Sequence, residues 1–184
     1  MKYRHVLLGI VFCLSSIGAT KAQDPILNIE NRVQIDPMWC WAAASEQIIY
    51  WLTGNDISQC QLVATAKHAN PMICCTTVGA CSVPGSLTDI QNLVLAYGGH
   101  YSSIAPPASP SVLYNTLLNN KAVVIYLQTS PTIGHFVVLR GMAWQNTPDG
   151  MMPIFYLNDP MSIYVRPVDF NQLYSIWRAA IVVY

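Results

Sequence analysis

Apolar residues follow two patterns along the chain, and the change falls near Lys121. Before it they recur at helical spacing, and residues 39–52 are apolar on most of their surface, which is typical of a buried helix. Gly54 is placed to end this helix, because glycine readily adopts the left-handed conformation at a helix C-terminus. Serine start signals predict three further helices, over residues 58–68, 86–97 and 109–118.

Beyond Lys121 the chain consists of short runs rich in β-branched and aromatic residues, separated by Gly, Pro or Asp turns. Such runs predict β-strands, here over residues 122–128, 135–144, 152–159, 162–167 and 178–184. A block of helices followed by a block of strands indicates an α+β domain with an antiparallel sheet. Residues 23–36, before the first helix, are expected to be extended up to Pro37.

The first 22 residues are interpreted as a secretory signal peptide. A basic head with Lys2 and Arg4 precedes an apolar run at residues 6–17, and small residues follow up to Ala22. The run is too short to cross a bilayer core, which needs about 20 residues. We therefore predict cleavage before Gln23, a secreted or periplasmic location, and a single domain over residues 23–184.

Composition narrows the range of partners. Three of the nine Lys and Arg residues lie in residues 1–22, which leaves six against nine Asp and Glu, a net charge of about −3. Since no basic stripe exists, neither nucleic acid nor, after signal cleavage, a membrane is expected as a partner. The high apolar content allows a large core and an exposed apolar surface, either a substrate groove or a docking patch.

The cysteines point to one thiol. Five cysteines follow the signal peptide. In an oxidising compartment cysteines tend to pair as disulfides, so an odd number leaves one of them as a free thiol. Four of them cluster between Cys60 and Cys81, whereas Cys40 stands apart in the first turn of the buried helix. Free N–H groups and the helix dipole stabilise a thiolate there, so Cys40 is the candidate nucleophile, with a plain core cysteine as the alternative.

A histidine at the start of a predicted strand is the candidate base. His135 follows Gly134, and its side chain can project from the sheet edge towards a cleft. His68 is placed at a helix end and His100 in a loop, where structural or solvated roles are more usual. An imidazole close to a thiol completes the activation of the thiol as a nucleophile.

Three polar positions complete the candidate site. Asn158 and Asp159 end the strand that follows His135, and because adjacent strand residues point to opposite faces, only one of them can orient the imidazole. Asp159 can also serve the turn that it makes with the following proline. Gln34 precedes Cys40 by six residues, and its amide can act with the Cys40 backbone N–H as an oxyanion donor.

These residues resemble those of the papain-like cysteine peptidases in type, spacing and chain order. The WCWAA run and the later NDP are similar to the compact bacterial branch, which includes staphopain-like peptidases, avirulence-effector peptidases and the peptidase domains of bacteriocin exporters. The Cys-Gly-Ser lead-in of the plant-type enzymes is absent. The residues that carry the resemblance are Gln34, Cys40-Trp41, Gly134-His135 and Asp159.

The resemblance implies an N-terminal helical half packed on a C-terminal antiparallel β-sheet half, with the active site in the cleft between them. It also implies hydrolysis of peptide bonds in a protein or peptide substrate through a thioester on Cys40, with no cofactor and no metal. In this scheme His135 is the base and then the acid, and Gln34 is the oxyanion donor. Asp159 orients the imidazole, and Asn158 is the alternative because plant-type relatives use Asn there.

Activity must be restrained by some means other than a long propeptide, since about a dozen residues separate the predicted cleavage site from Gln34. A separate protein inhibitor, delivery to a target compartment and narrow specificity are the options. The leading prediction is a secreted or periplasmic cysteine endopeptidase. The alternatives are a papain-like amidase that cleaves peptidoglycan and an inactive papain-like binding protein.

The clustered cysteines are expected to form two disulfides between the second and third predicted helices, because export favours disulfides. A zinc site that includes His68 is the alternative, but adjacent cysteines are awkward tetrahedral ligands. Four cysteines allow three connectivities, and the sequence does not select one. The four residues are Cys60, Cys74, Cys75 and Cys81.

Overall fold

The computed structural model describes residues 24–184. The predicted signal peptide, residues 1–22, and its cleavage before Gln23 lie outside the described residues. None of the helices in the described part is long and apolar enough to span a membrane.

The helices are α1 (Cys40–Thr53), α2 (Gln59–Ala66), α3 (Pro71–Thr76), α4 (Leu87–Leu93), α5 (Pro110–Leu118) and α6 (Phe170–Ile176), with a 3-10 turn η1 (Val78–Cys81) and a π-helical turn η2 (Val94–Gly98).

The strands form one antiparallel sheet in the order β1-β6-β2-β3-β4-β5. Strand β6 lies between β1 and β2, so the last strand in the sequence is an interior strand of the sheet. The predicted α+β class with an antiparallel sheet is confirmed. The strands are β1 (Ser102–Ala105), β2 (Val123–Gln128), β3 (Gly134–Thr147), β4 (Gly150–Asn158), β5 (Val168–Asp169) and β6 (Trp177–Val183).

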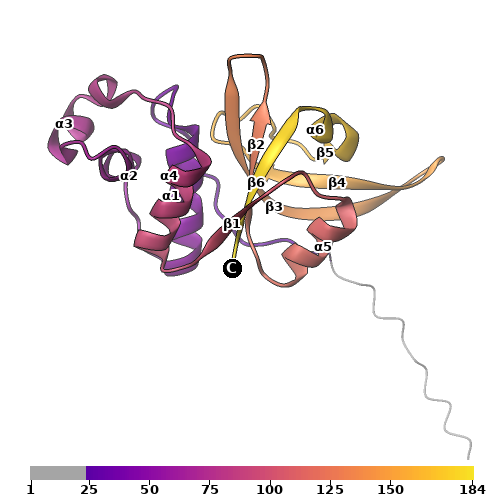
Figure 1. The fold of residues 1–184 in the computed structure, drawn as a ribbon. Helices are drawn as coiled ribbons and strands as arrows, with labels where there is room; N and C mark the ends of the chain where they lie inside the picture. Colours follow the sequence, from indigo (N-terminus) through magenta and orange to yellow (C-terminus); the bar gives the residue numbers. More distant parts are fainter. Residues whose placement is uncertain (1–23) are drawn as a thin grey trace, which may run out of the picture.

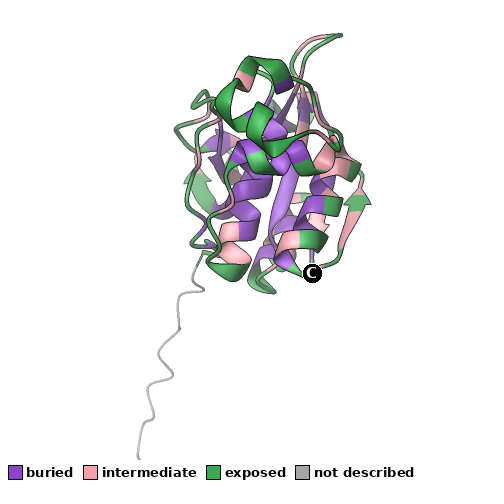
Figure 2. Ribbon diagram, turned by 90° about the vertical axis from the view of Figure 1, so that its left-hand side faces the viewer, coloured by how far each residue is buried: buried purple, intermediate pink, exposed green. Residues whose placement is uncertain are grey.

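The helices α1 to α4 gather on one side of the molecule and the sheet lies on the other, as the resemblance implied (Figure 1). Helix α1 contacts both parts, since it packs against α2, α4 and β3. Its first ten residues are all buried, which explains why the sequence shows no polar face. Figure 2 shows these buried residues behind the largely exposed outer helices.

The ends of α1 are set by different interactions. Gly54 adopts a left-handed conformation, with φ of 73°, and its N–H donates to Tyr50 O, as predicted from the sequence. At the other end the Trp39 N–H donates to Asp36 O, and no side chain caps the helix. Cys40 is therefore the first helical residue, and the first N–H groups of α1 are left without a side-chain acceptor.

The prediction of a strand over residues 162–167 is wrong. This segment is a loop, and β5 comprises only Val168 and Asp169. The β-branched and aromatic residues do not pair because the Ile163 and Tyr164 N–H groups donate to the Asp159 carboxylate instead of to a neighbouring strand. The sequence analysis also missed β1 and the short helices α3 and α6, of which α6 begins with an Asp169 cap.

The four clustered cysteines form two disulfides, Cys60–Cys75 and Cys74–Cys81, as expected. The first joins α2 to α3, and the second joins α3 to the end of η1. All four sulfurs are used in these bonds, so they are not available as zinc ligands.

Candidate active site

The Cys40 thiol lies at the N-terminal end of α1, facing a pocket between the helices and the sheet. Within residues 24–184, Cys40 is the one cysteine outside a disulfide. Its side chain is nearly covered, with 9% of the residue exposed. The uncapped N–H groups and the positive end of the helix dipole favour a negative charge at this position.

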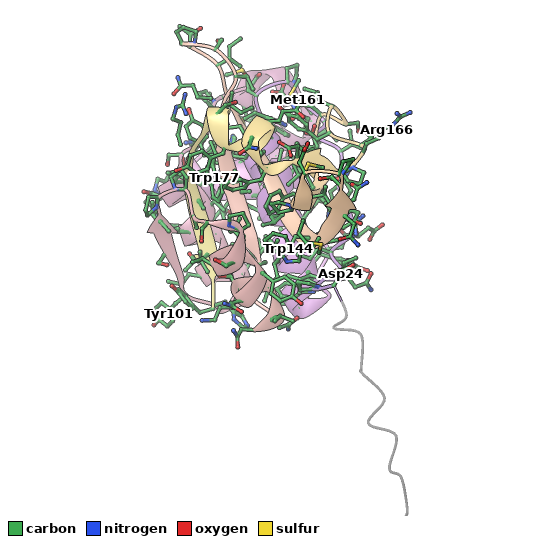
Figure 3. All side chains as sticks on the ribbon, turned by 90° about the vertical axis from the view of Figure 1, so that its right-hand side faces the viewer. Asp24, Tyr101, Trp144, Met161, Arg166 and Trp177 are labelled. Atoms are coloured by element: carbon green, nitrogen blue, oxygen red, sulfur yellow. A yellow bond between two sulfur atoms is a disulfide. The ribbon has the colours of Figure 1, made fainter. Side chains whose placement is uncertain are left out.

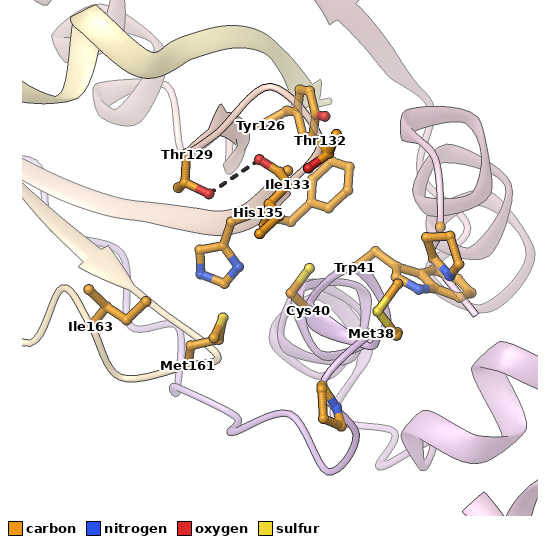
Figure 4. Close-up of a pocket in the computed structure, with 15 residues that line it drawn as sticks. Met38, Cys40, Trp41, Tyr126, Thr129, Thr132, Ile133, His135, Met161 and Ile163 are labelled. Atoms are coloured by element: carbon orange, nitrogen blue, oxygen red, sulfur yellow. Dashed lines mark hydrogen bonds between the residues drawn. The ribbon is translucent and has the colours of Figure 1, made fainter. Parts of the chain in front are cut away.

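The His135 imidazole lies opposite the Cys40 sulfur (Figure 4). His135 is the second residue of β3 and pairs with Leu127 of β2, so the ring projects from a part of the sheet that is fixed on one side by β2. Only 3% of the residue is exposed. The ring atom Nδ1 is buried and makes no hydrogen bond with any described residue. The Cys40 side chain lies on the open side of the ring, where both residues line the pocket.

The Asp159 carboxylate holds the other side of the imidazole. His135 Nε2 is 2.6 Å from Asp159 Oδ1, and both side chains are buried. The same carboxylate accepts the backbone N–H groups of Met161, Ile163 and Tyr164 at 2.7–2.9 Å. Asp159 therefore fixes both the ring and the loop that follows β4.

Asn158 points away from the imidazole. Its amide donates to Ile29 O at 2.8 Å. This orientation follows from the alternation of adjacent residues at the end of β4. Of the two residues considered from the sequence, the structure brings Asp159 and not Asn158 to His135.

The electrostatics of the pair favour a protonated imidazole beside a carboxylate. Burial alone would lower the pKa of His135, but the hydrogen bond to Asp159 and the interaction with Cys40 outweigh it and raise the pKa to about 9. Burial alone would raise the pKa of Asp159, but the hydrogen bonds from His135 and from two backbone N–H groups outweigh it and lower the pKa. At neutral pH the arrangement therefore holds an imidazolium close to the thiol.

Gln34 lies between the start of α1 and the loop that follows Asp159. Its backbone N–H donates to Pro160 O at 3.0 Å, and its side-chain Nε2 donates to Asp36 O and Pro37 O at 2.9 and 3.0 Å. Both amide hydrogens are thus bonded to the turn that leads into Cys40. Gln34 is not among the residues that line the pocket.

The pocket has a volume of about 520 Å³, and its lining includes no Asp, Glu, Lys or Arg. Figure 3 shows that Arg166, on the same loop as Met161, projects outward instead. A pocket of this kind accepts uncharged side chains and excludes charged ones, which would lose their hydration without a partner. The lining residues are Pro37, Met38, Cys40, Trp41, Pro84, Gly85, Tyr126, Thr129, Thr132, Ile133, Gly134, His135, Phe136, Met161 and Ile163.

Two glycines bring the pocket walls into close contact with aromatic rings. A Cβ at Gly85 would lie 2.0 Å from Trp41 Cδ2, and a Cβ at Gly134 would lie 2.3 Å from the Tyr126 ring. A side chain at either position therefore requires a wall of the pocket to move. The sequence analysis did not single out Gly85 or Tyr126, and the Pro84-Gly85 pair was the available signal.

Among the described residues, no group of three or more His, Cys, Asp or Glu side chains is arranged to hold a metal ion. The geometry places the Cys40 side chain opposite an imidazole that is hydrogen-bonded to the buried Asp159 carboxylate. This arrangement can activate a thiol for attack on a carbonyl carbon.

Comparison with known proteins gives a consistent picture. Residues 21–174 match a family model described as papain-like cysteine protease AvrRpt2. No curated protein sequence matches the chain. Among solved structures, the chain is similar to a protein from Bacillus anthracis described as a C39-like peptidase, with a TM-score of 0.59 and 15% identity, over 88% of this chain and 98% of the other. At this identity the structural likeness concerns the fold.

Proposed function

Because the chain belongs to the AvrRpt2 family of papain-like cysteine proteases, we propose that it is an exported endopeptidase in which Cys40 is the nucleophile. His135 is the general base and then the acid, and Asp159 orients the imidazole. The observation that carries this proposal is the buried hydrogen bond of His135 with Asp159, together with the Cys40 side chain that faces the same imidazole across the pocket.

The first half of the reaction transfers the acyl group to the enzyme. The Cys40 thiolate attacks the scissile carbonyl carbon, and the carbonyl oxygen becomes an oxyanion. As this intermediate collapses, the protonated His135 gives its Nδ1 proton to the leaving amine, the C–N bond breaks, and a thioester on Cys40 remains. In the second half His135 acts as the base and takes a proton from water, and the hydroxide adds to the thioester carbonyl. The C–S bond then breaks, which regenerates the Cys40 thiolate and releases the carboxylic acid product.

The oxyanion needs donors at the start of α1. The Cys40 backbone N–H is one of the uncapped groups there, and Cys40 itself lines the pocket. We assign Gln34 as the second donor. This role requires its Nε2 to exchange the bond to Pro37 O, the more exposed of its two bonds, for one to the substrate.

The substrate is a protein or peptide, as the family implies, and the pocket favours uncharged residues beside the scissile bond. Export is supported by the two disulfides, which form and persist in oxidising compartments such as the periplasm or the exterior.

The test is hydrolysis of unfolded casein by the wild type and by Cys40→Ala. The variant is expected to lose cleavage completely while its circular dichroism and melting temperature stay close to those of the wild type. The matched control is Cys60→Ser/Cys75→Ser, which removes two cysteines outside the pocket and is expected to retain cleavage. Undiminished cleavage by Cys40→Ala would reject the assignment.

The two alternatives give different results in the same series. A peptidoglycan amidase would release peptides from purified cell wall and leave casein intact. An inactive binding protein would cleave neither, and its thiol would react slowly with iodoacetamide at pH 6–7, where a thiol paired with an imidazolium should react fast.

A further inference from the structure

One short segment supports the start of α1 from the side of the helical half. This segment, residues 81–85, runs from the end of η1 towards α4. Two tryptophan indoles and one aspartate from the turn around Cys40 bond to it. The three hydrogen bonds are Trp39 Nε1 to Cys81 O at 2.9 Å, Trp41 Nε1 to Val83 O at 3.2 Å and Ser82 Oγ to Asp36 Oδ1 at 2.8 Å.

The same segment forms a wall of the pocket. Pro84 and Gly85 line it, and Gly85 lies directly against the Trp41 ring. A displacement of residues 81–85 would therefore change the pocket and the residues on both sides of Cys40 at once. Trp39 and Trp41, which flank the thiol, are fully buried, so they have no solvent bonds to replace those they would lose.

The Cys74–Cys81 disulfide cross-links the start of this segment to α3. Cys81 is the first residue of the segment and the last of η1, a turn of four residues. Cys74 is fully buried in α3. The other disulfide, Cys60–Cys75, joins α2 to α3 and contributes no residue to the pocket or to the bonds around Cys40.

We propose that the Cys74–Cys81 disulfide is a positioning element of the peptidase and makes its activity depend on the redox state of the compartment. A dithiol reductant transfers two electrons and two protons to this disulfide, which becomes two thiols, while the reductant closes into its own disulfide. Residues 81–85 then lose their covalent tie, and activity falls even though Cys40 is reduced.

The enzyme thus has two opposite redox requirements. Cys40 must be a free thiol to attack, and Cys74–Cys81 must be oxidised to hold the pocket wall. The inference rests on the proposed role of Cys40. The requirement for the Cys74–Cys81 disulfide restricts full activity to compartments in which a structural disulfide is stable. This restriction does not depend on which substrate is cleaved.

The test compares two double variants that each retain the other disulfide, as verified by peptide mass mapping. Cys74→Ser/Cys81→Ser is expected to lose about 10- to 100-fold in kcat/KM, the cost of small misplacements in an active site. Cys60→Ser/Cys75→Ser is expected to stay within about threefold of the wild type, since it leaves residues 81–85 tied. All assays run well below the melting temperature of each variant.

A second measurement separates positioning from a general loss of fold. The rate of Cys40 alkylation by iodoacetamide is followed against pH, and in Cys74→Ser/Cys81→Ser we expect a slower reaction at neutral pH with circular dichroism unchanged. In the wild type, a dithiothreitol titration should reduce activity as Cys74 and Cys81 become alkylatable, and reoxidation should restore it.

The inference is overturned if Cys74→Ser/Cys81→Ser keeps wild-type kcat/KM and alkylation rate, or if both double variants lose activity equally. These results leave the proposed function intact as long as Cys40→Ala is inactive. Cleavage by Cys40→Ala would reject the proposed function instead, so the two failures are distinguishable.

Discussion

His135 Nε2 and Asp159 Oδ1 lie 2.6 Å apart, and the carboxylate in this pair also holds three backbone N–H groups of the next loop. Met161 and Ile163 of that loop line the pocket. One side chain thus links the orientation of the imidazole to the shape of the substrate site.

Removal of the Asp159 carboxylate should affect both the orientation of the imidazole and the shape of the substrate site. Asp159→Ala is expected to lower kcat about 10²- to 10⁴-fold, because the imidazole loses the partner that fixes its tautomer and orientation. It should also raise KM, because the loop loses its anchor. Asp159→Asn, which keeps one oxygen acceptor, should fall between Asp159→Ala and the wild type in steady-state assays. A larger loss for Asn158→Ala than for Asp159→Ala would contradict the assignment.

The alkaline limit of activity should follow His135. Its pKa is raised to about 9, so the imidazolium that protonates the leaving amine is lost as the pH rises through that value. We expect kcat/KM to fall above pH 9, since this ratio reports groups of the free enzyme. In Asp159→Asn the fall should begin at lower pH, because the negative charge that raises the pKa is gone. An unchanged alkaline limb in that variant would show that another group sets it.

Stability should also depend on pH through this pair. The pKa of His135 is raised from 6.5 to about 9. Its contribution to the free energy of unfolding is therefore complete below about pH 6.5 and is lost as the pH rises through about 9. The pKa of Asp159 is lowered from 3.8, so its contribution is present above that pH and is lost as the pH falls through the folded-state pKa. Urea unfolding of the wild type and of His135→Gln from pH 3 to 10 checks this. The variant should lose the alkaline decline, and a parallel decline in both would refute the linkage.

The proposed role of Gln34 as an oxyanion donor can be separated by kinetics from its anchoring of the turn before Cys40. As an oxyanion donor it acts in the transition state, so Gln34→Ala should lower kcat about 10²- to 10³-fold with little change in KM. As an anchor of the turn at Asp36 and Pro37, its loss should mainly lower the free energy of unfolding, by about 1–3 kcal/mol. Equal kcat values with reduced stability would assign it the anchoring role alone.

Gly85 should be intolerant of a side chain. A Cβ there would lie 2.0 Å from the Trp41 ring, so Gly85→Ala is expected to destabilise the protein by about 1–3 kcal/mol and to lower kcat/KM by moving the pocket wall. Gly79→Ala is the control, because a Cβ at Gly79 meets no atom within 4 Å. Thermal unfolding and casein cleavage are measured for both. Equal effects of the two substitutions would exclude the contact with Trp41 as the cause.

Local signals in the sequence predicted most of the helical half. Gly54 ends α1 as expected, and the serine signals at Ser58, Ser86 and Ser109 precede α2, α4 and α5. Cysteine counting singled out Cys40, because an odd thiol is visible without any knowledge of the fold. The helix signals depend on residues within a few positions of one another, and the cysteine count requires no spatial information.

Features that depend on distant parts of the chain could not be read in this way. The choice between Asn158 and Asp159 depends on how β4 pairs with β3, where the register shifts between Leu139 and Gly141. The loop at residues 162–167 has strand-like composition, and it stays out of the sheet because Asp159 takes its N–H groups. The contact of Gly85 with Trp41 joins positions 44 residues apart in the printed sequence.

The position of β6 has a consequence for biosynthesis. The strand that carries His135 is supported by β2, and β2 is in turn paired on its far side with β6, which comprises Trp177–Val183. A nascent chain that lacks these residues leaves β2 without its partner on that side. The support of the His135 strand is therefore complete only after residues 177–183 have been synthesised, so we expect no activity from an earlier nascent chain.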